Sequence, residues 1–111
     1  MTYKYTTANL SSLKFIYPKA TISLFTIRHN DKDITPISTK IEKESTAYIE
    51  FCYSENVTYY LVISYDSEFI NELANLLENL DIIYAYKKAS QRDYQYLNSI
   101  AEICNTYTNI E

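Results

Sequence analysis

The fold of this chain is decided by residues 47–65, which read AYIEFCYSENVTYYLVISY. Apolar side chains alternate with polar or aromatic ones on each side of a short polar break, and this period of two is typical of β-strands. We therefore predict a β-hairpin in which residues 47–53 pair with residues 57–65 across the loop 54–56. Because the chain contains no glycine, Asn56 is expected to take the left-handed conformation that glycine usually supplies in such a loop.

The length of this loop also predicts the register of the hairpin. The inner face pairs Phe51 with Tyr59 and Ile49 with Leu61, and the outer face pairs Glu50 with Tyr60 and Tyr48 with Val62. Tyr59 and Tyr60 then point to opposite faces, so we expect that they are not both core residues. Tyr48 and Tyr60 are available for binding unless a helix covers the outer face, in which case they belong to the core.

Two further strands are predicted before the hairpin. Residues 21–28 have a strand-like pattern and end at a polar turn, residues 29–33. A second strand alternates Ile37, Thr39 and Ile41 on one face, and Pro36 indicates that it begins late or lies at a sheet edge.

Three helices are predicted around these strands. The first begins at the N-cap Thr7, carries Leu10, Leu13 and Tyr17 on one side, and ends before Pro18. The second is the most regular, because Asp66 caps a stripe with the 3.6-residue period of a helix. This stripe consists of Phe69, Ile70, Leu73, Leu76, Leu77 and Leu80. The third opens with a capping-box pattern at Ser90 and Asp93 and turns four residues inward: Leu97, Ile100, Ala101 and Cys104.

These elements predict one compact α+β domain over residues 1–111, an antiparallel β-meander of about four strands packed against two or three helices. Residues 81–86 fit either a fifth strand or the tail of the preceding helix, and their length does not decide between them. No apolar run reaches the roughly 18 to 20 residues that a membrane helix needs, and residues 1–13 lack the apolar centre of a secretory signal. We therefore expect a soluble protein of the cytoplasm.

The residue inventory argues against an enzyme. Phosphate-binding loops and nucleophile elbows in their usual forms need glycine, which is absent. The single histidine, His29, lies in a predicted turn with no Cys, Ser or carboxylate pattern to partner it. Asp31 and Asp33 have the alternate spacing of a calcium loop but lack its central glycine and distal glutamate. The two cysteines lack zinc-site or redox spacing, so no catalytic residue, metal site or cofactor is expected.

Charge is distributed unevenly along the chain. Residues 1–41 carry six bases and two acids, whereas residues 42–81 carry nine acids and only one base, Lys43. The predicted helix after Asp66 turns carboxylates and amides outward without a lysine: Glu68, Asn71, Glu72, Asn75, Glu78 and Asn79. Glu68 and Glu72 repel each other at one helical turn, and Glu78 and Asp81 oppose the helix dipole. This face is either an ordinary solvated surface or one shaped for a basic partner.

Tyrosine is the second unusual feature, with 13 residues in 111. Tyr94 and Tyr96 point about 200° apart on a helix, so one of them is expected to face solvent or a neighbour. Binding surfaces favour tyrosine because it combines a large rigid ring with a polar hydroxyl. The predicted partner-binding residues are therefore acidic, amide and tyrosine side chains: Tyr48, Glu50, Glu55, Tyr60, Asp66, Glu68, Glu72, Asn75, Glu78 and Asp81.

The leading hypothesis is a non-enzymatic inhibitor that presents this acidic, tyrosine-rich surface to a basic groove that normally holds nucleic acid. The abundance of residues with AT-rich codons indicates an AT-rich genome. In size, acidity and this composition the chain resembles phage-encoded anti-defence proteins such as anti-CRISPRs, a resemblance of profile that covers no motif. It implies a basic partner in the bacterial host cytoplasm, such as a nuclease or a CRISPR effector, with no direct contact to nucleic acid or membrane and with a homodimer possible.

Two other functions stay open on the sequence. One is the binding of single-stranded nucleic acid on an aromatic sheet face formed by Tyr48 and Tyr60, with the basic N-terminal part. The other is a small structural or assembly subunit of a virion or mobile element, in which exposed tyrosines join copies of the chain.

Overall fold

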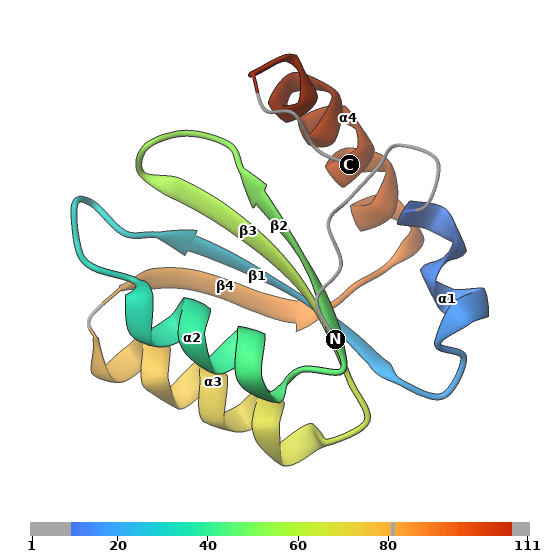
Figure 1. The fold of residues 1–111 in the computed structure, drawn as a ribbon, viewed down its shortest axis with the longest axis horizontal. Coiled ribbons are helices and arrows are strands. Elements are labelled where there is room, and N and C mark those ends of the chain that lie inside the picture. Colours follow the sequence, from blue (N-terminus) through green and yellow to red (C-terminus); the bar gives the residue numbers. More distant parts are fainter. Residues whose placement is uncertain (1–9, 81, 108–111) are drawn as a thin grey trace.

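The computed structural model describes residues 10–80 and 82–107 and has an α+β fold (Figure 1). The four strands are β1 (Thr21–Arg28), β2 (Ala47–Cys52), β3 (Val57–Ser64) and β4 (Ile83–Lys88). The helices are α1 (Leu13–Ile16), which follows a 3-10 turn at Leu10–Ser12, α2 (Thr35–Glu44), α3 (Ser67–Asn79) and α4 (Gln91–Tyr107). All neighbouring strands are antiparallel and their order is β2-β3-β1-β4.

The strand order differs from that of a meander. β1 lies between β3 and β4, whereas the sequence analysis expected strands to pair in consecutive order. α2 connects β1 to β2, which are separated in the sheet by β3, and β1 pairs with β3 on one side and with β4 on the other. The predicted number of strands is right, but one predicted strand is a helix and residues 83–88 supply the fourth strand instead.

The prediction of a strand around Ile37 and Ile41 is wrong, because both residues belong to α2. They are four residues apart, so in a helix they lie on one face, and both are buried. Pro36 lies in the first turn, where its missing N–H costs no hydrogen bond. The carboxylate of Asp33 accepts a 2.9 Å hydrogen bond from the backbone N–H of Thr35 at the start of this helix. The period-two pattern of three residues was too short to exclude a helix.

The hairpin is confirmed, with all four predicted residue pairs in register. The prediction for Asn56 is wrong, since among the described residues only Asn30 and Asp31 have positive φ, at 45° and 68°. The loop closes through a 3.2 Å hydrogen bond from the Ser54 N–H to the Val57 carbonyl. The left-handed backbone conformation therefore occurs in the polar turn after β1 and not in the hairpin loop.

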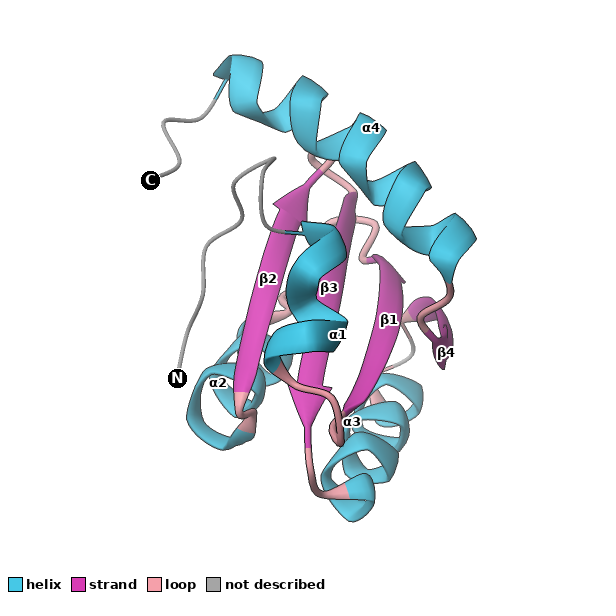
Figure 2. Ribbon diagram, turned by 90° about the vertical axis from the view of Figure 1, so that its right-hand side faces the viewer, coloured by secondary structure: helices cyan, strands magenta, loops and turns pink. Residues whose placement is uncertain are grey.

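Helices cover both faces of the sheet and create two cores (Figure 2). α2 and α3 pack on one face, and α1 and α4 lie on the other. Tyr59 and Tyr60 on β3 belong to opposite cores and are 8% and 1% exposed. The expectation that they are not both core residues is therefore wrong, because a strand covered on both faces buries both of its sides.

The remaining helix predictions are largely confirmed. The apolar stripe of α3 faces the core under α2 and α3. Leu76 and Leu80 are partly buried, and the other members of the stripe are buried. In the capping box of α4, Asp93 Oδ2 accepts hydrogen bonds from the Ser90 N–H at 2.8 Å and hydroxyl at 2.9 Å. Tyr94 is buried and Tyr96 is exposed, as their spacing predicted.

Some predicted features lie outside the described residues. The first helical segment begins at Leu10 in the described chain, and its expected N-cap Thr7 is not among those residues. Asp81 and the side chains of Ala101 and Cys104 are also outside them. In the part of the chain that is described, no helix has the length and apolar character needed to cross a membrane.

Candidate partner-binding surface

The outer side of α3 presents the acidic and amide residues that the sequence predicted. Six outward residues are all exposed: Glu68, Asn71, Glu72, Asn75, Glu78 and Asn79. Asp66 is the N-cap, and its Oδ1 accepts a 3.0 Å hydrogen bond from the Glu68 N–H. The cap satisfies one of the free N–H groups at the helix start. Five of the predicted binding residues therefore share one helix: Asp66, Glu68, Glu72, Asn75 and Glu78.

α2 adds Glu44 beside this face, whereas Glu42 lies about 200° round the helix and interacts with Tyr48 of β2. Lys40 of α2 links the helices, because its Nζ lies 2.8 Å from Glu44 Oε2 and 3.4 Å from Glu72 Oε1. The hydrogen bond to Glu44 raises the pKa of Lys40, burial opposes this, and Glu72 reinforces it. One ammonium is thus shared by two carboxylates, and the cluster keeps a net negative charge.

A shallow hollow of about 290 Å³ runs between α2 and α3 and is open to solvent. Lys40, Glu72, Asn75, Leu76 and Asn79 line it. Small-molecule sites are usually enclosed and mainly apolar. An open hollow with charged and amide walls is better suited to receive side chains of a macromolecular partner.

The edge strand β2 continues the acidic surface past α2. Tyr60 donates a 3.1 Å hydrogen bond to Glu50 Oε2, and its hydroxyl lies 2.8 Å from Ser38 Oγ of α2. Burial and the charges of Glu42 and Glu50 raise the pKa of Tyr48, which is half-buried. The two carboxylates therefore approach the Tyr48 hydroxyl from α2 and from β2.

Tyr60 does not contact a partner with its ring, because α2 and α3 bury the side chain almost completely. Burial raises the pKa of Tyr60 above its usual value. Its hydroxyl positions the exposed carboxylate of Glu50, so Tyr60 is a positioning residue of the surface. The predicted aromatic platform of Tyr48 and Tyr60 is absent from this sheet face, which carries helices.

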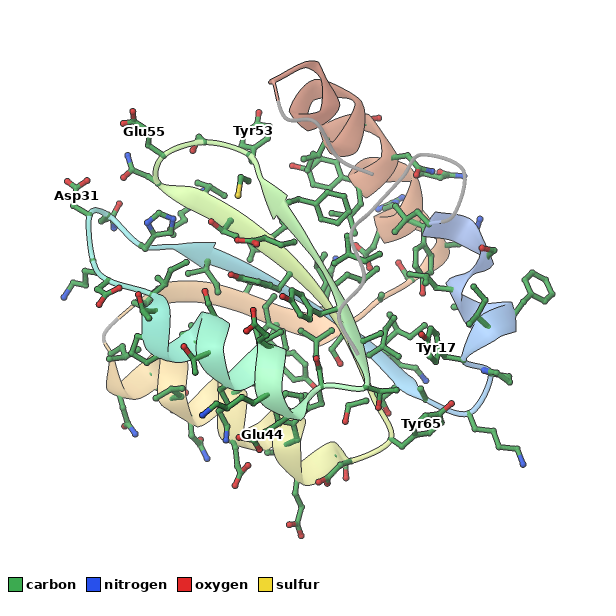
Figure 3. All side chains as sticks on the ribbon, viewed as in Figure 1. Tyr17, Asp31, Glu44, Tyr53, Glu55 and Tyr65 are labelled. Atoms are coloured by element: carbon green, nitrogen blue, oxygen red, sulfur yellow. The ribbon has the colours of Figure 1, made fainter. Side chains whose placement is uncertain are left out.

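Two of the predicted binding residues, Glu55 and Asp81, are not part of this arrangement. Glu55 lies at the tip of the β2-β3 hairpin, far from Glu44 of the acidic helices, as Figure 3 shows. Asp81 lies outside the described residues. The exposed Tyr65 directly precedes the N-cap Asp66, and it was not among the residues predicted from the sequence. In the sequence, the position of Tyr65 directly before the predicted N-cap Asp66 was the feature that could have indicated its exposure.

We define the acidic surface as the outer sides of α2 and α3 with the adjoining edge of β2. Its carboxylates are Glu42, Glu44, Glu50, Asp66, Glu68, Glu72 and Glu78, and its lysines are Lys40 and Lys43. Glu42 and Glu44 were counted among the acids of residues 42–81 but not predicted as binding residues, because the segment before them was assigned to a strand. The four-residue spacing of Ile37 and Ile41 was the signal that identifies the helix.

The described residues show no arrangement typical of a catalytic site. His29 Nε2 lies 3.3 Å from Thr58 Oγ1, and no cluster of three or more metal-ligating side chains occurs between residues 10 and 107, apart from the undescribed position 81 and masked side chains. Comparison with known proteins gives no relative, since no family model, no curated protein and no solved structure matches this chain.

Proposed function

We propose that this protein is a non-enzymatic inhibitor that occupies a basic, nucleic-acid-binding groove of a partner protein with its acidic surface. The observation that carries the proposal is the gathering of seven carboxylates from α2, α3 and β2 beside only two lysines. These elements are neighbours, and the Lys40 contact with Glu44 and Glu72 joins the two helices directly.

The physical basis is the imitation of a nucleic-acid backbone. A basic groove that binds nucleic acid is built for a row of regularly spaced negative charges. The helix supplies such spacing, because Glu68 and Glu72 are one turn apart, about 6 Å along the axis. Charge of one sign also steers a basic partner and speeds its association. Mutual repulsion of these carboxylates costs little, because each exposed pair contributes only a few tenths of a kcal/mol.

Composition extends the proposal to a biological setting. An AT-rich, small and acidic chain fits an anti-defence protein of a phage or mobile element that acts in the bacterial cytoplasm. The partner is then a host nuclease or CRISPR effector whose groove is basic. No cofactor or metal takes part in this mechanism.

A competition experiment tests the proposal. Labelled DNA is bound to a panel of nucleases and CRISPR effectors, and the protein is added while DNA release and cleavage are measured. We expect release from at least one effector, and we expect the Glu68→Lys, Glu72→Lys double variant to need at least about tenfold more protein. Asp31→Lys, Glu55→Lys is the matched control, because it makes the same charge change in two exposed loops away from α3.

The control separates surface from net charge. If both double variants lose activity equally, the total charge and not the α3 face governs inhibition. If no effector releases DNA with the unaltered protein, the proposed function is wrong.

A further inference from the structure

On the sheet face that carries α1 and α4, the side chains become more exposed toward the end with the β2-β3 hairpin loop. At one end of this face Ile22 and Leu24 of β1 are buried. Further along the same strand Thr26 is half-buried and Arg28 is exposed. Ala85, which pairs with Thr26 from β4, is also exposed, as is Tyr53 just after β2. This end of the sheet therefore lacks a cover among the described residues.

The path of α4 explains the open region. α4 runs diagonally from the β4 side toward the β2 side (Figure 2), and it packs against β2 and the turn at Leu10–Ser12. α1 lies at the other end of the sheet, where it contributes Leu13 to the core. We call the uncovered part the open sheet end and define it by Thr26, Arg28, Tyr53 and Ala85.

Three tyrosines border the open sheet end. The Tyr59 ring is flanked by Tyr53 and by Tyr96 of α4, each with its centroid 6.1 Å away and its plane turned by 80° and 79°. The Tyr59 and Tyr96 hydroxyls are 3.2 Å apart, and burial together with Tyr96 raises the pKa of Tyr59 to about 12. Tyr53 and Tyr96 are 46% and 52% exposed. The buried Tyr59 ring thus contacts two rings, Tyr53 and Tyr96, that are both partly exposed.

The residues beside Tyr59 in the sheet are small. Thr26 pairs with Tyr59 on one side and with Ala85 on the other. Directly paired side chains stand only about 5 Å apart. Thr26 and Ala85 therefore put two small side chains next to the large ring of Tyr59.

The charge on this side of the molecule is opposite to that of the acidic surface. The described cations here are Arg28 of β1, Lys87 and Lys88 of β4 and Arg92 of α4, while Lys14 of α1 and Lys19 after it lie at the other end of the sheet. Asp93 is buried and bound to Lys87 at 2.8 Å and to Ser90. Within the described chain no carboxylate lies at ion-pair distance from Arg28 or Arg92. Arg92 precedes Tyr96 by one turn, so both occupy one side of α4.

We propose that the open sheet end binds single-stranded nucleic acid, with bases stacked on Tyr53 and Tyr96 and backbone phosphates at Arg28 and Arg92. Base stacking on aromatic side chains beside a cationic track is the usual basis of single-strand binding. An acidic peptide would use the cations but would leave the flat rings without a planar partner. Seven carboxylates belong to the acidic surface and lie away from this site, so the net charge of −4 is not concentrated here, whereas Glu55 lies on the hairpin loop two residues after Tyr53. The site goes beyond the proposed function and uses none of its residues.

Fluorescence anisotropy of a labelled oligothymidylate on the order of ten nucleotides long tests this proposal. We expect saturable binding that weakens as salt increases. Tyr96→Ala and Arg28→Gln are each expected to weaken it about tenfold, and Tyr53→Ala provides a second test of stacking. Tyr65→Ala and Lys43→Gln are the matched controls, because both residues are exposed and neither belongs to the open sheet end; they are expected to leave binding unchanged.

Three results would overturn the proposal. One is no anisotropy change at low salt with the unaltered protein. Another is equal affinity for inorganic polyphosphate or polyglutamate, which would show that the cations act without stacking. The third is an effect of Tyr65→Ala as large as that of Tyr96→Ala. The Glu68→Lys, Glu72→Lys variant is expected to retain oligonucleotide binding, so failure of the inhibitor function is distinguishable from failure of this site.

Discussion

Tyr60 shows how one side chain serves both the core and the acidic surface. Its ring fills the space under α2 and α3, and its hydroxyl reaches Ser38 and Glu50 at the sheet edge. A buried hydroxyl needs such partners, because an unsatisfied polar group in a core costs free energy. The ring therefore determines packing, and the hydroxyl determines where the Glu50 carboxylate stands.

Tyr60→Phe separates these two roles. It keeps the ring and removes both hydrogen bonds, so we expect the free energy of unfolding to fall by about 1 kcal/mol. Chemical denaturation measures this loss. Tyr65→Phe is the control and should change stability by less than about 0.5 kcal/mol, because Tyr65 is exposed. A loss above about 3 kcal/mol for Tyr60→Phe would contradict this account, since it would mean that the packing itself had failed.

At the scale of elements, the start of α4 depends on a buried carboxylate. Asp93 accepts hydrogen bonds from Ser90 and lies 2.8 Å from Lys87 at the end of β4. Burial alone would raise the pKa of Asp93, but the bonds from Lys87 and Ser90 outweigh it and lower this pKa. The same carboxylate thus caps a helix and attaches it to the sheet.

Asp93→Asn is expected to destabilise the protein by about 1 kcal/mol at neutral pH. Because the folded pKa lies below the unfolded value of about 3.9, the ionised carboxylate contributes its full stability above that value. The contribution is lost as the pH falls below it toward the folded pKa. Denaturation at pH 7 and near pH 2 measures both states, with exposed Asp31→Asn as control. A stability difference that is the same at both pH values would contradict the role of the charge.

At the scale of the whole molecule, a single sheet separates two cores and two kinds of surface. β3 is buried on both faces, with Leu61 in the core under α1 and α4 and Val62 in the core under α2 and α3. The acidic surface lies outside the core under α2 and α3, and the open sheet end lies beside the core under α1 and α4. This separation allows a chain of net charge −4 to present acidic and basic surfaces at once.

The two cores should behave independently when each loses one side chain. Leu61→Ala and Leu73→Ala remove buried leucines from opposite sides of the sheet, and each is expected to cost about 2 to 5 kcal/mol. Their effects should add to within about 0.5 kcal/mol in the double variant, because the sites share no core. Half-buried Leu76→Ala should cost less. A coupling above about 1 kcal/mol would show that the sheet transmits repacking between the cores.

The sequence by itself determined the elements whose pattern is local and repeated. The hairpin of β2 and β3, its register and the stripe of α3 follow from side-chain period, and the Asp66 and Asp93 caps follow from short-range hydrogen bonding. It also identified the outward carboxylates of α3, because a helix fixes which residues share a face. Ile37 and Ile41 escaped, since three alternating residues satisfy both a strand and a helix.

Only the tertiary structure decided which surfaces are free. It buried Tyr60 beneath two helices, left Tyr53 and Tyr96 exposed around Tyr59, and brought Glu44 and Glu72 to one lysine. It also placed β4 beside β1 and not beside β3. These outcomes depend on contacts between residues far apart in the chain, whose energies arise when one element buries its apolar face on another. A local period specifies the face of each element, whereas packing between elements specifies what that face meets.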